Sequence, residues 1–237
     1  MLTFHVPFII ALPSLFALHG VLERNPRTPA GTICDEFRLS SSDAKLYRTL
    51  DKVLSDSEIE LVLIGTPNDT HYALVKASLE AGKHVLMDKP VTPSVQEAKE
   101  LGELAKERKK VVCIPESEMG SRLFSVEEIV GLTGKRSKEL GFDRYCIGLK
   151  GTWKDEPRPA AGPIFDPGVH LTDQTLCLFG RPTKITAFAS NLGVGHPNVD
   201  DNVNFTIHMH YPARSALPYS FTAILHAHPL SVRSPQI

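Results

Sequence analysis

The chain has 237 residues, of which 42% are hydrophobic and 22% charged, an ordinary composition for one large or two small globular domains. Its formal net charge of -1 gives no basis for binding nucleic acid or an anionic membrane, and no apolar run is long enough to span a bilayer. The four cysteines are far apart and form no CxxC motif, so we expect no disulfide framework and a cytoplasmic location. Cys113 and Cys177 lie within apolar runs and are expected to be core residues.

Residues 1–20 are mostly apolar and contain no Lys or Arg. A secretory signal peptide is one interpretation, but the stretch lacks a basic start and a small-residue cleavage site, and Pro7 and Pro13 interrupt it. The alternative is an amphipathic helix that ends at Pro13, followed by a strand over residues 15–23. Phe8, Ile9, Ala11 and Leu12 would lie within that helix.

Residues 61–90 have the pattern of strand, helix and strand. Residues 61–64 form an apolar run typical of a parallel strand buried on both faces, and Pro67 ends it. A helix with Val75 and Leu79 inside follows, and a second strand covers residues 84–87. In open α/β sheets the loops after the carboxyl ends of strands hold ligands, so the two loops of this unit predict a ligand site.

The remaining elements are expected from local patterns. A loop is expected over residues 25–42, followed by a short helix within residues 43–56. Thr92 or Ser94 can cap a helix that reaches residue 109, with inward positions at Val95, Ala98, Leu101, Leu104 and Ala105. Further strands are expected at residues 111–114, 142–149, 183–190, 204–211 and 219–225, and a helix at residues 125–133.

A second motif begins at Asp166. If Pro167 opens a helix, Asp166 caps it, and His170 lies on the same face as Asp166 and Asp173. This spacing suits a histidine held by a carboxylate. The opposite face would bury Leu171, Leu176, Leu178 and Phe179.

TPNDTH, followed by EAGKHVLMDKP, resembles the Gfo/Idh/MocA family of NAD(P)-dependent sugar and polyol oxidoreductases. The usual family form is TPN-x-x-H and then AGKHV-x-x-EKP, so Asp88 replaces the common Glu. The stretch GPIFDPGVHLTD resembles the family's D-x-G-x-H-x-x-D motif, although Ala160-Ala161-Gly162 stands where a glycine pair is usual. The segment ESEMGSRLF after Pro115 does not match, so the substrate cannot be read from it.

The resemblance implies an α/β fold, in which an incomplete Rossmann-type parallel sheet precedes an α+β domain with a partly missing antiparallel sheet. The dinucleotide-binding domain would cover residues 1–115, and the substrate and oligomerisation domain residues 116–237. In the family, a strand and a GxGxxG turn come directly before the first helix, and the sequence has neither. A truncated sequence at both ends is the expected explanation, and a genuinely altered fold is the alternative.

The resemblance also implies site residues. Lys89, Asp166 and His170 would be catalytic, with His170 as the base, Asp166 orienting it and Lys89 stabilising the alkoxide. The cofactor-side positions would be Thr66, Pro67, Asn68, His71, Asp88, Lys89 and Pro90. No metal is implied. We expect a sugar or polyol substrate, no nucleic acid or membrane partner, and a homo-oligomer formed through the second domain's sheet.

Glu23 and Arg24 follow the strand expected after the first helix. An acidic residue at this place accepts the adenosine ribose hydroxyls of NAD, whereas an arginine holds the 2′-phosphate of NADP. Having both leaves the choice between NAD and NADP open.

Two competing interpretations remain from the sequence. A catalytically impaired nucleotide-binding relative with a regulatory role is one, and the missing glycine turn favours it. The other is a zinc site made from two HxH pairs on neighbouring strands, namely His208, His210, His226 and His228.

Overall fold

A computed structural model describes residues 2–40, 43–114, 139–146, 158–162, 164–191, 203–212 and 221–229. The chain divides into two compact units. Unit 1 comprises Met1–Thr66 and Thr70–Ile114, and unit 2 comprises Pro67–Asp69 and Pro115–Ile237. Within the described ranges, no helix has the length and apolarity needed to cross a membrane.

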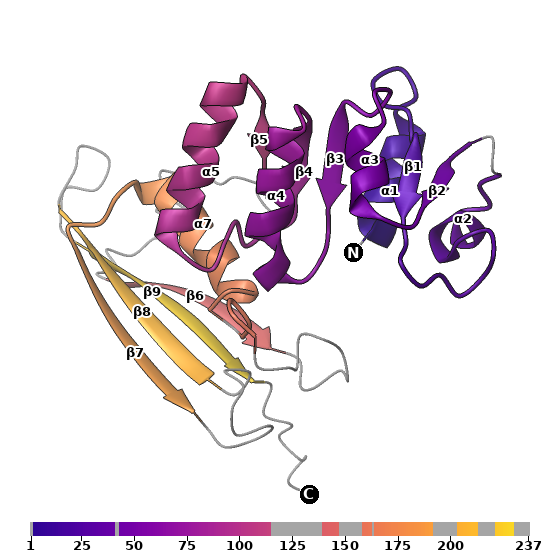
Figure 1. The fold of residues 1–237 in the computed structure, drawn as a ribbon. Helices are drawn as coiled ribbons and strands as arrows, with labels where there is room; N and C mark the ends of the chain where they lie inside the picture. Colours follow the sequence, from indigo (N-terminus) through magenta and orange to yellow (C-terminus); the bar gives the residue numbers. More distant parts are fainter. Residues whose placement is uncertain are drawn as a thin grey trace, which may run out of the picture. The chain divides into compact units, whose positions relative to one another are not determined.

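Unit 1 contains five short strands (Figure 1), which are β1 (Gly20–Leu22), β2 (Lys45–Tyr47), β3 (Leu61–Ile64), β4 (His84–Met87) and β5 (Val112–Cys113). They form one sheet of order β1-β2 and a second of order β3-β4-β5. Every pairing is parallel, so the carboxyl ends of neighbouring strands lie at the same edge, as the strand–helix–strand pattern predicted.

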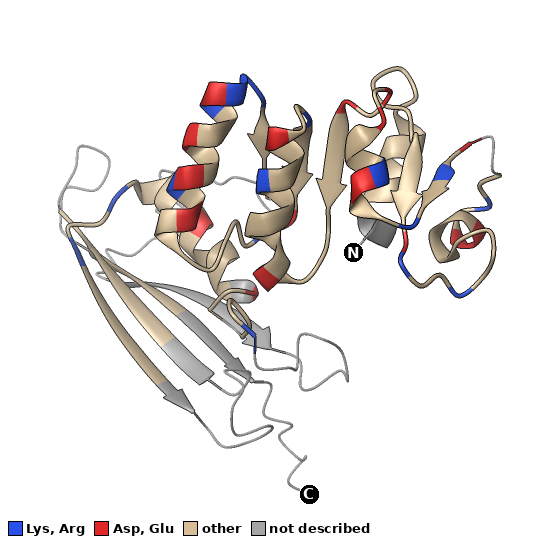
Figure 2. Ribbon diagram, viewed as in Figure 1, with Lys and Arg blue, Asp and Glu red and all other residues tan. Residues whose placement is uncertain are grey.

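The helices of unit 1 are α1 (Leu2–Ala11), α2 (Thr32–Glu36), α3 (Leu50–Ser55), α4 (His71–Glu80) and α5 (Val95–Arg108). Ser94 caps α5, because its hydroxyl accepts a hydrogen bond from the Glu97 amide. Gly82 follows α4 with a φ of 74°, the left-handed conformation expected after a helix. Charged residues of both signs occur along α4 and α5 (Figure 2), and most of them are exposed.

The apolar core of the β3–β5 half confirms most of the positions expected from helical periodicity. Its buried members are Ile64, Val75, Leu79, Val85, Met87, Leu101 and Ala105. Val95 is wrong as a core position, since its side chain is 73% exposed. It is the first residue of α5.

The helix expected near the amino terminus is confirmed as α1, but it is not amphipathic as predicted. Val6 is 2% exposed and packs with Val21 and Ile33, whereas Phe8 is 59% exposed and Leu12 42%. The stretch is apolar on every side, so periodicity does not single out one buried face.

A cavity of about 580 Å³ lies between β1 and β3, lined by residues of both strands and of α1. Among the described residues, β1 pairs only with β2 and β3 pairs only with β4, so each has one unpaired edge.

Three expectations for the amino-terminal half need correction. The strand expected over residues 15–23 is only Gly20–Leu22, the loop over 25–42 contains the helix Thr32–Glu36, and Lys45–Tyr47 is a strand that the pattern did not predict.

Cys113 and Cys177 were expected in the core, but both are exposed. Cys113 belongs to a two-residue edge strand, and apolar neighbours in sequence did not ensure burial there.

Unit 2 contains the helix α7 (Pro167–Phe179) and the strands β6 (Glu139–Cys146), β7 (Lys184–Asn191), β8 (Val203–Tyr211) and β9 (Phe221–Pro229). The sheet order is β6-β9-β8-β7. The β9–β8 and β8–β7 pairings are antiparallel, as expected, but β6 pairs with β9 in parallel. The helix expected at residues 125–133 lies outside the described residues.

α7 packs on β9 and β6 of this sheet. Leu171 and Phe179 are buried against it as predicted, together with Met209, Tyr211, Ala223 and Leu225. Leu176 is 37% exposed, so its predicted burial is wrong. It follows the fully buried Thr175 and therefore points away from the sheet.

Candidate functional site

The loops after β3 and β4 are joined by His71, the first residue of α4. Its side chain is fully buried, with Nδ1 at 2.8 Å from the Pro90 carbonyl oxygen and Nε2 at 3.1 Å from the Thr66 carbonyl oxygen. A neutral imidazole has one N–H and donates to one of these carbonyls, whereas a doubly protonated ring donates to both. His71 thus ties together the two loops that the sequence assigned to ligand binding.

Asp88, the first residue after β4, pairs with His5 of α1. His5 Nε2 lies 2.8 Å from Asp88 Oδ1, and the side chains are only 11% and 12% exposed. The other carboxylate oxygen, Oδ2, is buried and has no hydrogen-bond partner within the described part of the chain. Sequence reasoning missed His5, because no local signal links residues 83 positions apart.

Lys89 is partly buried and joined to Pro90 by a cis peptide bond. On the neighbouring loop, the hydroxyls of Thr66 and Thr70 lie 2.6 Å apart. Five of the residues predicted for the site are therefore at the carboxyl edge of β3 and β4, namely Thr66, His71, Asp88, Lys89 and Pro90.

The segment Pro67–Asp69 groups with unit 2. Asn68 is 8% exposed and donates a 2.6 Å hydrogen bond from Nδ2 to the Ala160 carbonyl oxygen. The Asp69 carboxylate lies 3.5 Å from the Arg158 guanidinium. Asn68, which the sequence analysis assigned to the cofactor side, thus uses its side-chain amide to bind the segment around Ala160.

Asp166 and His170 are one turn apart at the start of α7, as the spacing predicted. Asp166 occupies the N-cap position, and Pro167 follows as the first helical residue. The Asp166 side chain makes no capping hydrogen bond, so that part of the expectation is wrong; its φ and ψ of -88° and -75° are not the extended values a capping side chain needs. His170 is 8% exposed.

Glu23 lies directly after β1, and its carboxylate binds the start of α2. Oε2 accepts from the Thr32 amide at 2.9 Å and Oε1 from the Ile33 amide at 2.8 Å. Partial burial pushes the pKa of Glu23 upward, but these amides, the Thr32 hydroxyl and the charge of Arg48 together hold that pKa below its ordinary value. Arg24 is exposed.

Arg48, directly after β2, is a neighbour of this position that sequence reasoning missed. Its Nη1 donates to the Glu23 carbonyl oxygen at 3.3 Å. The Glu23 amide donates to the Tyr47 carbonyl oxygen at 3.1 Å, which continues the parallel ladder one residue past β1. Glu23, Arg24 and Arg48 therefore lie together at the carboxyl edge of β1 and β2.

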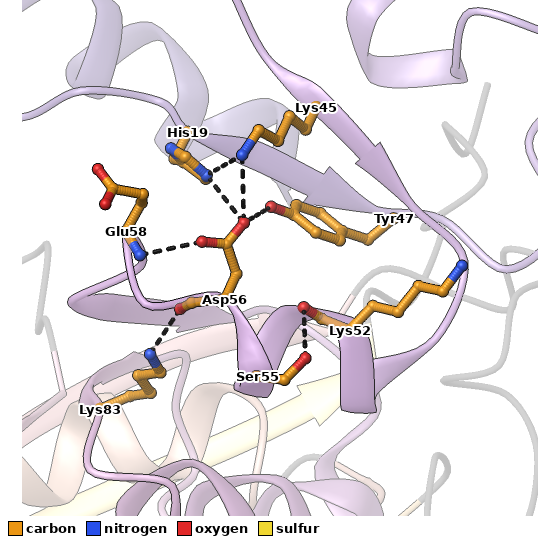
Figure 3. Close-up of polar contacts among 8 residues, drawn as sticks. All are labelled: His19, Lys45, Tyr47, Lys52, Ser55, Asp56, Glu58 and Lys83. Atoms are coloured by element: carbon orange, nitrogen blue, oxygen red, sulfur yellow. Dashed lines mark hydrogen bonds and ion pairs between the residues drawn. The ribbon is translucent and has the colours of Figure 1, made fainter.

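A different polar cluster surrounds Asp56 at the amino ends of β1 and β2 (Figure 3). Asp56 Oδ2 accepts from the Tyr47 hydroxyl at 2.6 Å and lies 3.2 Å from both His19 Nε2 and Lys45 Nζ. Its Oδ1 accepts from the Glu58 amide at 2.9 Å. The Tyr47 bond, foremost, and the Glu58 amide hold the pKa of Asp56 far below its usual range. Burial, and then the contact with Asp56, raise the pKa of Tyr47 to about 12.

The strand register does not allow the four-histidine zinc site. Thr206 lies opposite His226, whereas His210 lies opposite Thr222, four residues further along β8. At about 3.4 Å per residue the two positions are about 14 Å apart along the strand, too far for one tetrahedral ion. Over the described ranges, no group of three or more His, Cys, Asp or Glu could hold a metal ion.

A parallel sheet with ligand-type loops at its carboxyl edge, followed by a helix on a mixed sheet, defines a protein of the Rossmann nucleotide-binding class with a second α+β domain. The family model described as "Oxidoreductase family, NAD-binding Rossmann fold" matches residues 2–115, and the GFO/IDH/MocA C-terminal domain matches residues 136–232. The chain belongs to the Gfo/Idh/MocA oxidoreductase family.

Individual relatives agree with this assignment. An uncharacterized oxidoreductase of Schizosaccharomyces pombe is 38% identical over 89% of this chain and 57% of its own length. The scyllo-inositol 2-dehydrogenase (NADP(+)) IolW of Bacillus subtilis is 28% identical over 78% of this chain and 52% of its own. The crystal structure of an NAD-binding protein from Listeria innocua, 25% identical, superposes with a TM-score of 0.77 over 98% of this chain and 65% of its own. The chain thus spans little more than half the length of these curated relatives.

Proposed function

We propose that the protein is an NAD(P)-dependent oxidoreductase that moves a hydride between the nicotinamide and the carbinol carbon of a sugar, polyol or related alcohol. The observation that carries the proposal is the hydrogen-bonded pair of loops after β3 and β4, which His71 joins at the carboxyl edge of a parallel sheet. These loops contain the residues that match the family's nicotinamide-side and lysine motifs. The Bacillus subtilis relative is a scyllo-inositol 2-dehydrogenase, which supports a polyol as the substrate class.

The residues present fit the two ends of a dinucleotide. At the adenosine end, exposed Arg24 and Arg48 suit a phosphate, and at the other end the buried Asp88 Oδ2 suits an amide donor such as the nicotinamide carboxamide. No glycine precedes Gly20 in the sequence, so we assign no residue to the pyrophosphate. When bound, the nicotinamide supplies the hydride acceptor, and the protein supplies orientation and proton transfer.

We propose Lys89, Asp166 and His170 as the catalytic residues. In the oxidising direction the carbinol C–H bond breaks with its electron pair, and an imidazole nitrogen of His170 takes the hydroxyl proton. The Lys89 ammonium stabilises the negative charge that develops on the oxygen. Asp166, one turn before His170 on α7, orients the imidazole or binds a neighbouring hydroxyl.

Titration of the purified chain with NADH and NADPH, followed by nicotinamide fluorescence, tests cofactor binding. A panel of polyols that includes scyllo-inositol then tests turnover. We expect Lys89→Ala and His170→Ala each to lower kcat by about 10²–10⁴-fold while leaving cofactor binding in place. Lys76→Ala, on the exposed face of α4, and His208→Ala, on β8, are the matched controls.

Two results would reject the proposal in different ways. No fluorescence change with either dinucleotide would show that the chain binds neither cofactor. An unchanged kcat in Lys89→Ala or His170→Ala would show that the substituted residue is not catalytic.

A further inference from the structure

The carboxylate of Glu23 is committed to the protein itself. Each of its oxygens accepts one amide of the first two residues of α2, at 2.9 Å from Thr32 and 2.8 Å from Ile33. Nearby Gly31 has a φ of 108°, and a Cβ there would lie 3.4 Å from Glu23 Oε1. Turning the carboxylate toward a ligand would leave both amides without their acceptor.

This arrangement bears on the choice between the two cofactors. NAD-dependent proteins of this class use an acidic side chain after the strand to accept the adenosine ribose 2′-hydroxyl. Here the acidic side chain is present, but it serves as the acceptor for a helix start. Glu23 is therefore poorly suited to select an unphosphorylated ribose.

Two arginines occupy the same edge. Arg48 Nη1 lies 3.3 Å from the Glu23 carbonyl oxygen, which belongs to the peptide that joins Glu23 to Arg24. Both arginines are exposed, and Arg24 makes no side-chain hydrogen bond or ion pair with any described residue. Guanidinium groups bind phosphate oxygens through paired N–H donors, so two of them at one edge favour a phosphate monoester.

The acidic groups nearby do not cancel this charge. The Glu23 carboxylate accepts two amides and is itself balanced by Arg48. Asp35 and Glu36 follow later in α2 and are exposed to solvent, which screens their effect. Arg27 is also exposed, but no hydrogen bond joins its side chain to Glu23 or Arg48 within the described part of the chain.

We propose that this chain selects NADP over NAD, with Arg24 and Arg48 binding the 2′-phosphate and Glu23 serving as the cap of α2. The inference rests on the proposed function, because it names which dinucleotide the adenosine end takes. The cofactor in the name of the Bacillus subtilis relative, NADP(+), is in keeping with it.

Isothermal titration calorimetry of the whole chain with adenosine 2′,5′-bisphosphate, ADP and inorganic phosphate tests the inference without catalysis. We expect the bisphosphate to bind at least about tenfold more tightly than ADP. Arg24→Ala and Arg48→Ala should each weaken bisphosphate binding by about tenfold and leave ADP binding unchanged. Arg27→Ala is the matched control, expected to change neither by more than about twofold. Circular dichroism melts of each variant check that it is folded.

The outcomes separate this inference from the proposed function. If ADP binds as tightly as the bisphosphate and Arg24→Ala has no effect, NADP selection is wrong while dinucleotide binding stands. If inorganic phosphate binds as tightly as the bisphosphate, the arginines are a general anion patch and the inference is also wrong. If neither nucleotide binds, and NADH and NADPH likewise fail, the proposed function itself is overturned.

Discussion

The two halves of unit 1 are held together by different forces. In the β3–β5 half, Val75, Leu79, Val85 and Met87 are fully buried and form a continuous apolar core under α4 and α5. In the β1–β2 half the strands are three residues long, and the apolar core around Val6, Val21 and Ile33 is small. There two networks of polar contacts converge on the carboxylates of Glu23 and Asp56.

The two kinds of interaction stabilise the protein in ways that depend differently on pH. Apolar burial contributes in proportion to the area removed from water and responds little to pH. Carboxylate networks contribute through hydrogen bonds to the ionised form, so they depend on pH. We therefore expect core substitutions to destabilise the β3–β5 half most, and acid to act mainly on the β1–β2 half.

The largest expected effect is that of Leu79→Ala. Leu79 is fully buried, so its truncation leaves a cavity and should lower the free energy of unfolding by about 2–5 kcal/mol. Phe8→Ala, at a residue of the other half that is 59% exposed, is the control and should cost less than about 1 kcal/mol. Urea denaturation followed by circular dichroism measures both, and equal losses would contradict the contrast between the halves.

A smaller effect is expected from the pH dependence of the Asp56 cluster. The pKa of Asp56 is depressed in the folded protein. Its contribution to the free energy of unfolding is therefore present above pH 3.8, the ordinary pKa, and is lost as the pH falls below that value. The pKa of Tyr47 is raised from 10.0 to about 12 in the folded protein. Its contribution to the free energy of unfolding is therefore present below pH 10 and is lost between pH 10 and 12.

Thermal melts across this pH range measure both losses. Asp56→Asn should flatten the acid loss, and Tyr47→Phe should flatten the alkaline loss. Glu58→Gln is the control, because Glu58 contributes only its backbone amide to Asp56. A wild-type protein whose stability is independent of pH in both windows would show that the network contributes nothing.

What the sequence could predict follows the same division. The helices α4 and α5 and the core positions Val75, Leu79 and Leu101 were predictable, because apolar spacing within one helix is a local signal. The loops after β3 and β4, which we propose bind the ligand, were singled out through motifs of fixed spacing. The face of α1 was not predictable, because a helix that is apolar on every side has no distinctive stripe.

The polar contacts were missed because they join distant residues. His5 pairs with Asp88 across 83 positions, and Asp56 binds His19 across 37, neither of which any periodicity could indicate. Strand β2 was missed because Lys45–Tyr47 is too short for an alternating pattern. Glu23 was placed correctly at a strand end, but its hydrogen bonds to α2 depend on a helix that looked like a loop in the sequence.

The central claim is that both halves of unit 1 contact one dinucleotide, through the arginines after β1 and β2 and through the loops after β3 and β4. Amide hydrogen exchange of the whole chain with and without NADPH tests this most directly. The account predicts added protection in two separate places, around Arg24 and Arg48 and around His71 and Lys89. Unchanged exchange in either place at saturating NADPH would contradict it.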